Sequence, residues 1–315
     1  MRWTHSILFW LLVSSTLALF WPVDHLGFDP FVMQGWMLWV AIVITMFSLG
    51  GLVIPQELRP LRERPWWVVL GILVQILVMP LAAWTVTRVI PMTSEMALGV
   101  LLVGCVPGAM ASNVLTNTGG GSVAYSVSLT SMATLLSPIT VPLILWLLAR
   151  QQTESTLVES SLKLAAFVTL PTLVGYVISL RYLSIRRFLQ SYGSLIASIA
   201  LLWIISTVVA KNRQALVSVP LVILLALFFI NMVGYLGGYF AGRVARIPTS
   251  YRRALTLEIG MQNAGLGTTL SLSILGEGTA AAIPTAAYTF GCMLTGTLLA
   301  VWWQFCDKRS SLTPS

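Results

Sequence analysis

Charged side chains are scarce in this sequence of 315 residues. It has 18 Lys and Arg and 10 Asp and Glu, so that 9% of its residues are charged, whereas soluble globular chains carry roughly 25%. Hydrophobic residues make up 57% of the chain, and its mean hydropathy is +0.87. So few charges exclude a cytosolic enzyme, a nucleic-acid-binding domain and a disordered protein. They indicate a polytopic membrane protein, for which lipid replaces water as the solvent.

Residues typical of metal sites and catalytic centres are also few. The two histidines are His5 and His25, and the three cysteines show no CxxC spacing, which argues against a zinc site or a disulfide framework. An intramembrane enzyme would need paired catalytic groups at depth, and the sequence offers no such pair. The longest polar connection, about 150–160, is too short to fold as a soluble domain. We therefore expect no enzyme, no organic cofactor, no nucleic-acid partner and no obligate protein partner.

Long apolar stretches are what the sequence has instead. A helix needs roughly 20 apolar residues to cross the hydrocarbon core of a bilayer. The hydropathy pattern predicts an all-α polytopic membrane protein with ten transmembrane helices. Their expected ranges are 4–21, 35–54, 66–88, 94–117, 122–149, 160–180, 191–210, 216–242, 250–276 and 280–305.

The distribution of basic residues predicts the orientation, because Lys and Arg gather in cytoplasmic loops. With the N-terminus inside, five basic residues lie outside: Arg88, Arg150, Lys163, Lys211 and Arg213. Thirteen lie inside: Arg2, Arg59, Arg62, Arg64, Arg181, Arg186, Arg187, Arg243, Arg246, Arg252, Arg253, Lys308 and Arg309. We expect a multi-pass protein of the cell's inner (plasma) membrane with both termini in the cytoplasm.

Two of the predicted spans are interrupted by helix-breaking residues and carboxamides. The fourth contains VPGAMASN at 106–113 and the ninth contains EIGMQNAG at 258–265. Asn113 and Asn263 lie 150 positions apart, which suggests two five-helix repeats, 1–150 and 151–315. An odd number of spans makes such repeats inverted, and paired broken helices are typical of secondary transporters. The alternative is that the glycines and carboxamides only serve helix packing.

Glu258 is the one acidic residue well inside a span, and no basic residue lies at its depth. A lone buried carboxylate is costly, so it should be protonated or bind a cation. Ser126 and Thr130 share one helix face because they are four residues apart. Such neutral oxygens beside a single carboxylate suit sodium, with a proton as the second possibility. The candidate oxygen ligands are Gln75, Ser112, Asn113, Ser126, Thr130 and Gln262, together with freed backbone carbonyls.

The two interruptions also bear on the charge of a substrate. Each would start a half-helix, near Ala111 and near Ala264, whose first amides and dipole favour an anion. We expect a small organic anion as the substrate, ahead of a neutral solute or an organic cation.

Three segments resemble the bile acid/sodium symporter family, which includes bacterial homologues of the apical sodium-dependent bile acid transporter. They are FSLGGLVIPQEL at 47–58, SNVLT at 112–116 with AYSVSLTS at 124–131, and EIGMQNAGL at 258–266. The resemblance extends over essentially the whole chain. It implies a core domain, a panel domain, crossing fourth and ninth helices, and two sodium ions that drive uptake of one organic anion by alternating access.

The resemblance also implies roles for individual residues. The first sodium site would use the side chains of Ser112, Asn113, Ser126, Thr130 and Glu258. The second would use the side chains of Gln75 and Gln262 with the carbonyls of Glu258, Ile259 and Met261. The substrate would meet Gly108, Met110, Ala111, Ser112, Asn263 and Cys292.

Two positions depart from the family pattern and leave alternatives open. Cys292 stands where bile-acid-handling members have a histidine, and Met110 replaces a small polar residue. Both changes make the cavity less polar, so smaller carboxylates such as 2-keto acids or pantoate-like compounds are alternatives to a bile acid. An efflux permease of the related arsenite type, using Cys105, and a proton-coupled anion carrier, using Glu258, are the other hypotheses. Arsenite sensitivity of cells carrying Cys105→Ser would discriminate the former.

Overall fold

Every regular element of the described chain is helical. The computed structural model describes residues 7–32, 34–149, 154–211, 213–217, 219–275 and 279–310. Over these residues it contains helices, turns and one isolated β-bridge. The predicted all-α class is therefore confirmed.

The helices fall into continuous and interrupted ones. The long continuous helices are α3 (Gly35–Leu52), α5 (Pro65–Val89), α8 (Val123–Ala149), α14 (Leu221–Val244) and α17 (Ala282–Ser310). Two long rods contain a π-helical turn each: α9 (Glu154–Leu164), η3 (Ala165–Thr169) and α10 (Leu170–Arg181), then α11 (Leu183–Phe188), η4 (Leu189–Gly193) and α12 (Ser194–Lys211). The shorter elements are α1 (Ile7–Leu19), α2 (Val23–Leu26), η2 (Pro55–Leu58), α4 (Arg59–Glu63), α6 (Ser94–Cys105), α7 (Ala111–Thr118), α13 (Arg213–Val217), α15 (Thr249–Gly260) and α16 (Ala264–Leu275).

Fewer helices are long enough to cross a membrane than the sequence predicts. Among the described residues six qualify by length and composition, or up to seven if the pair Trp36–Leu52 and Pro55–Glu63, bent by 84°, counts as one span. The predicted spans 94–117 and 250–276 are each divided into two short helices, and 4–21 contains the 13-residue α1. Residues 4–6 and the predicted repeat boundary at 150–151 lie outside the described residues. The count of ten thus stays a prediction.

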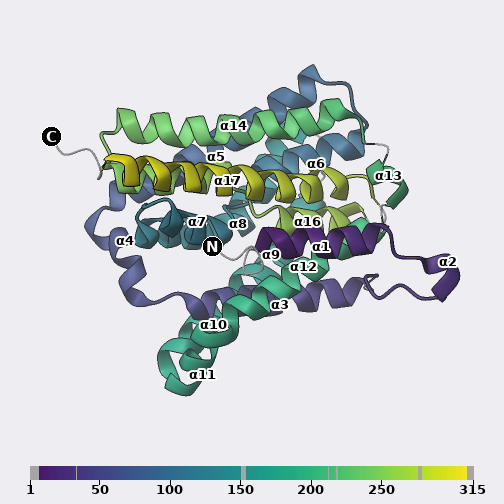
Figure 1. Ribbon diagram of the computed structural model, residues 1–315, viewed down its shortest axis with the longest axis horizontal. Helices are drawn as coiled ribbons and strands as arrows, with labels where there is room; N and C mark the ends of the chain where they lie inside the picture. Colours follow the sequence, from purple (N-terminus) through teal and green to yellow (C-terminus); the bar gives the residue numbers. More distant parts are fainter. Residues whose placement is uncertain are drawn as a thin grey trace.

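The helices pack in two groups (Figure 1). In one, α3 packs against α10 and α12, and α12 packs against α1. In the other, α14 packs against α5 and α15, while α17 packs against α16 and α6. The short helices α6, α7, α15 and α16 belong to this second group, so the interrupted segments are enclosed by long helices on several sides.

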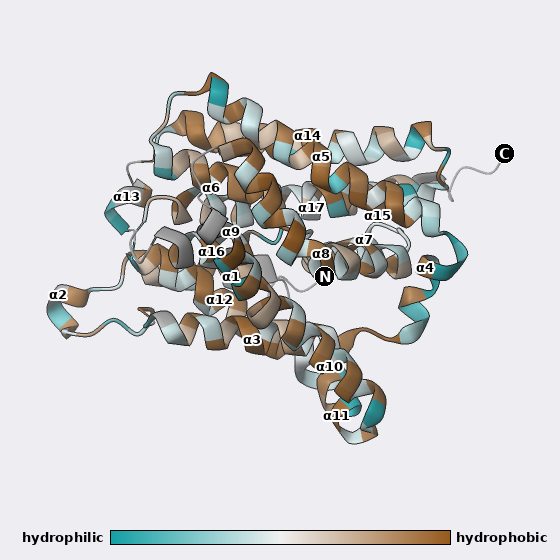
Figure 2. Ribbon diagram, turned by 180° about the vertical axis from the view of Figure 1, so that it is seen from behind, coloured by the Kyte–Doolittle hydropathy of each residue, from teal (hydrophilic) through white to brown (hydrophobic). Residues whose placement is uncertain are grey.

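Hydropathy along the ribbon follows the expected membrane pattern. Figure 2 shows mostly apolar residues along the helices and hydrophilic ones near the ends of the molecule, for example at α4, α2 and α13. Apolar side chains such as Trp66, Phe228 and Trp302 are exposed, as lipid-facing residues are. A multi-pass membrane protein accounts for this surface.

Arg253, on α15, joins the two interrupted segments at one end of the bundle. Its Nη1 donates to the carbonyl of Gly119 at 3.0 Å, at the C-terminal end of α7. Its two terminal nitrogens also bond both carboxylate oxygens of Asp307, at 2.6 and 2.7 Å. A guanidinium here complements the negative end of the α7 dipole, so Arg253 holds α7, α15 and α17 together.

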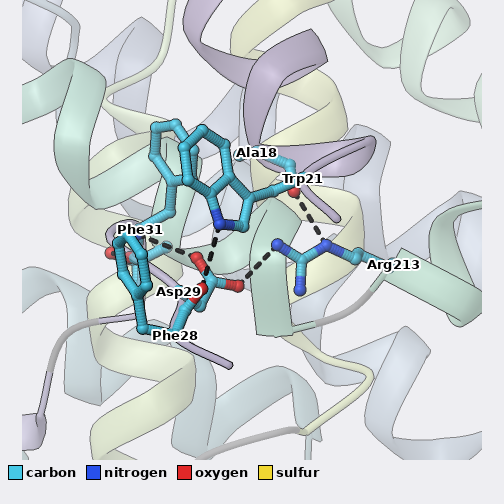
Figure 3. Close-up of polar contacts among 7 residues, drawn as sticks. Ala18, Trp21, Phe28, Asp29, Phe31 and Arg213 are labelled. Atoms are coloured by element: carbon cyan, nitrogen blue, oxygen red, sulfur yellow. Dashed lines mark hydrogen bonds and ion pairs between the residues drawn. The ribbon is translucent and has the colours of Figure 1, made fainter. Parts of the chain in front are cut away.

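A second arginine makes a cluster (Figure 3) near α13 and α2, at the opposite end of the molecule (Figure 1). Arg213 Nη2 bonds Asp29 Oδ2 at 2.5 Å, and Arg213 Nε donates to the Ala18 carbonyl at 2.8 Å. Asp29 Oδ1 accepts from the Phe31 amide, and Trp21 Nε1 donates to the Phe28 carbonyl. The cluster ties the start of α13 to the end of α1 and to the α2–α3 connection.

We expect Asp29→Asn to lower the free energy of unfolding by about 1–2 kcal/mol, because charged hydrogen bonds in partly buried sites exceed exposed ion pairs in strength. Side-chain exposure is 24% for Arg213 and 9% for Asp29. Glu63→Gln is the matched control, since the Arg59–Glu63 pair is 72% and 51% exposed. Thermal unfolding of Asp29→Asn, Arg213→Gln and the double variant measures the coupling. Additive effects in this cycle would contradict the assignment.

Candidate functional site

The two interrupted segments meet and pair through their backbones. The amide of Ala109 donates to the carbonyl of Met261 at 2.7 Å, and the amide of Asn263 donates to the carbonyl of Pro107 at 2.8 Å. These bonds make the antiparallel bridge between Gly108 and Gln262. Backbone groups left without helical partners are costly in an apolar interior, and here each break supplies partners for the other.

Proline explains where the first break begins. Pro107 has no amide hydrogen and disfavours the helical conformation at the preceding residue. Val106 is accordingly extended, with φ −69° and ψ 155°. The new helices α7 and α16 begin at Ala111 and Ala264, which are the starting points that the sequence predicts for the two half-helices.

The carboxylate of Glu258 lies beside this crossing, in a ring of hydroxyl groups. Ser112 Oγ and Thr130 Oγ1 each donate to it at 2.6 Å, and Ser126 Oγ lies 3.2 Å away. Glu258 is 2% exposed. Three residues from α7 and α8 thus converge on one acid from α15, and these four side chains belong to the predicted first sodium site.

Asn113, the fifth residue predicted for that site, lies at its edge. Its Oδ1 lies 3.4 Å from Thr130 Oγ1, and its Nδ2 lies 3.8 Å from Met110 Sδ. It therefore reaches the Glu258 carboxylate through Thr130.

Gly108 brings the crossing backbone directly against this carboxylate. A Cβ atom built at Gly108 would overlap with the Glu258 carboxyl group and contact no other group as closely. Since only glycine leaves room for the acid here, the close approach of the backbone to Glu258 requires glycine at this position. The resemblance had implied only a substrate contact for it.

Two carboxamides meet on the other side of the bridge. Gln75 Nε2, from α5, donates to Gln262 Oε1 at 2.7 Å, and Gln262 Nε2 donates to the Ile259 carbonyl at 2.8 Å. Gln75 Oε1 is buried without a hydrogen-bond partner among the described residues. Such an acceptor is costly unless something binds it. The residues of the predicted second site, including the Met261 carbonyl at the bridge, therefore lie together and offer an oxygen to a hard cation.

The residues predicted to face the substrate are more scattered. Met110 and Ala111 are half-buried at the start of α7. Asn263 Oδ1 accepts from the Leu266 amide at 3.2 Å, so this side chain caps the first turn of α16 instead of standing free. Cys292 is buried on α17 and lines a different cavity, between α14 and α17.

Some residues that bond the second break were not among the candidates from the sequence. Asn231 Nδ2 and Tyr288 Oη both donate to the carbonyl of Gly260, at 2.8 and 2.7 Å. Thr295 Oγ1 in turn donates to Asn231 Oδ1 at 2.7 Å. Asn231 could have been identified from the sequence, because it is a carboxamide in the middle of the apolar stretch that forms α14.

The chemistry of this arrangement favours cation binding. One carboxylate surrounded by hydroxyl and carboxamide oxygens provides ligands for a hard cation. Among the described residues there is no cluster of three His, Cys, Asp or Glu that could hold a metal ion. Cys105, the residue on which the arsenite hypothesis depends, is buried at the end of α6, two residues before Pro107.

Comparisons with known proteins identify relatives that are transporters. A family model described as the Sodium Bile acid symporter family matches residues 39–219. The chain is 29% identical over 300 residues to an uncharacterized sodium-dependent transporter of Bacillus subtilis, YocS, covering 95% of this chain and 91% of that protein.

Two further relatives come from eukaryotes. The probable chloroplastic sodium/metabolite cotransporter BASS1 of Arabidopsis thaliana is 29% identical over 295 residues, covering 94% of this chain and 72% of that protein. The ileal sodium/bile acid cotransporter of Oryctolagus cuniculus is 28% identical over 239 residues, covering 74% and 68%. These relatives are transporters and not enzymes. Since the family model matches more than half of its length, the chain belongs to the Sodium Bile acid symporter family.

Proposed function

We propose that this protein is a symporter that couples two sodium ions to the uptake of one organic anion by alternating access. The observation that carries the proposal is the buried Glu258 carboxylate, held by Ser112, Ser126 and Thr130 beside two paired helix breaks. Burial leaves the carboxylate short of water, so a monovalent cation with oxygen ligands would offset its charge.

The two ions would use the two oxygen clusters already described. The first would lie against the Glu258 carboxylate, with the hydroxyls of Ser112, Ser126 and Thr130 and the carboxamide of Asn113. The second would take Oε1 of Gln75 and of Gln262, with the carbonyls of Glu258, Ile259 and Met261. Because both clusters lie at the crossing, sodium would order the backbone at which the substrate arrives. This gives positive coupling between ion and substrate.

An organic anion is the substrate class that suits the site. The N-terminal ends of α7 and α16 favour a negative charge. Met110 makes the start of α7 less polar, which suits a smaller carboxylate such as a 2-keto acid or a pantoate-like compound. A bile acid remains the alternative within the class.

The proposal includes an architecture and a location. Ten spans would form two inverted repeats, 1–150 and 151–315, with the fourth and ninth helices broken. The protein would lie in the inner (plasma) membrane with both termini in the cytoplasm, since 13 of the 18 basic residues then lie on the cytoplasmic side.

Thermal stability of the purified protein tests the function. Pyruvate, pantoate and taurocholate would be screened in sodium chloride and in choline chloride. Ligand that binds the folded state at about 100 times its Kd adds about 2.7 kcal/mol to the free energy of unfolding. We expect sodium alone to stabilise the protein, and one carboxylate to add stability in sodium but not in choline. Carboxylate-dependent stabilisation in choline that strengthens at low pH would favour proton coupling and contradict the proposal.

A further inference from the structure

A cavity of about 320 Å³ lies between α14 and α17. It is within the range of ligand sites, ~300–1,000 Å³. Leu224 and Phe228 of α14 and Leu294 of α17 form part of its lining. Leu12 of α1 also lines it, and Figure 1 shows α1, α14 and α17 on the same face of the molecule.

The surroundings of this cavity are those of a lipid-facing surface. Leu224, Phe228 and Leu294 are exposed, and none of the described residues that line the cavity is charged. Both α14 and α17 contain windows long and apolar enough to cross a membrane. In a bilayer the neighbouring medium is hydrocarbon, so an acyl chain matches both the chemistry of the lining and what lies outside it.

Gly291 leaves room in the wall of the cavity. It is exposed on α17, and a Cβ atom built there meets nothing within 4 Å. Glycine inside a helix costs about 0.5–1 kcal/mol relative to alanine. At this position the glycine has no close neighbour that would explain it, but it does widen the cavity.

Two residues that line the cavity also bond the end of the interrupted helix α15. Asn231 and Tyr288 line the cavity, and both donate to the carbonyl of Gly260. Gly260 is the last residue of α15 and stands two positions after Glu258. A molecule in the cavity would therefore pack against the two side chains that hold the end of the broken helix.

We propose that this cavity binds an acyl chain of a membrane phospholipid. The bound chain stabilises the hydrogen bonds that Asn231 and Tyr288 donate to the Gly260 carbonyl. The effect on sodium rests on the proposed function, whereas the binding of the chain does not. The Glu258 carboxylate and the carbonyls of Ile259 and Met261 would then need less rearrangement to bind sodium.

Gly291→Phe places a ring at the wall of the cavity and tests the binding. The protein in nanodiscs would be labelled with phosphatidylcholine that carries a photoactivatable diazirine on its acyl chain, and the labelled peptides would be mapped. Gly291→Ala controls for the loss of glycine, and Leu298→Phe places the same ring one heptad further along an exposed face of α17. We expect labelling of 224–231 and 287–294 to fall at least fivefold in Gly291→Phe alone. Labelling spread evenly along α14 and α17, or unchanged in that variant, would overturn the site.

Lipid dependence of the sodium response tests the second half. In a sterol-based detergent without acyl chains, added dioleoyl phosphatidylcholine should lower the sodium concentration for half-maximal thermal stabilisation about threefold in the wild type and both controls. Gly291→Phe should show no change with lipid. An equal lipid effect in all four proteins would overturn the link to Gly260. A wild type that sodium never stabilises would defeat the proposed function while leaving the labelling result decisive for the cavity.

Discussion

Glu258→Gln is expected to lower sodium-dependent transport at least 100-fold while the protein still folds. The change removes the one charge at the crossing but keeps the shape of the side chain. The Ser112 and Thr130 hydroxyls can still bond a carboxamide, because a hydroxyl rotates to donate or to accept. What the variant lacks is the negative charge that a sodium ion requires. Uptake of a radiolabelled substrate into proteoliposomes, with and without a sodium gradient, measures the loss.

Glu63→Gln is the matched control for this result. It makes the same substitution at an exposed glutamate in α4, away from the crossing. It should transport at close to the wild-type rate. Glu258→Gln protein that elutes as a monodisperse peak and transports normally in sodium would defeat the assignment of Glu258 as an ion ligand.

Gly108→Ala is expected to reduce transport at least tenfold, the second-largest effect. The added methyl group would occupy the space of the Glu258 carboxyl group, and overpacking of a tight interior costs roughly 1–3 kcal/mol. The carboxylate has to move away from the hydroxyls of Ser112 and Thr130, or the backbone bridge to Gln262 has to open. Either change should raise the sodium concentration needed for half-maximal transport.

The same substitution at Gly291 separates this effect from a general cost of losing a glycine. A Cβ atom at Gly291 has open space, so Gly291→Ala should keep the wild-type sodium dependence. If Gly108→Ala had wild-type sodium dependence too, the close approach of this backbone to Glu258 would have no functional meaning.

The positions of the helix breaks could be predicted from the sequence because their causes are local. Proline at 107 and the glycines beside the carboxamides act within a few residues, so α7 and α16 start where they were expected. The grouping of Ser112, Ser126 and Thr130 around Glu258 was also within reach, since a lone buried acid needs polar partners. These contacts join residues up to 146 positions apart.

Other features depend on packing between distant helices and could not be predicted. The backbone bridge between Gly108 and Gln262 requires that both breaks lie at the same depth and cross. The hydrogen bonds from Asn231 and Tyr288 to the Gly260 carbonyl join α14 and α17 to α15. The role of Asn263 as a cap for α16 was missed for another reason: asparagine suits an N-cap as well as a binding site, and the residue type alone does not separate the two.

Direct binding of sodium to the purified protein tests the central claim most directly. Equilibrium binding of ²²Na⁺ would be measured on the wild type, Glu63→Gln and Glu258→Gln at equal protein concentrations. We predict saturable binding to the wild type and to Glu63→Gln, and at least a tenfold loss of affinity at the first site in Glu258→Gln. Wild-type binding in Glu258→Gln, or no saturable binding to the wild type, would contradict the account.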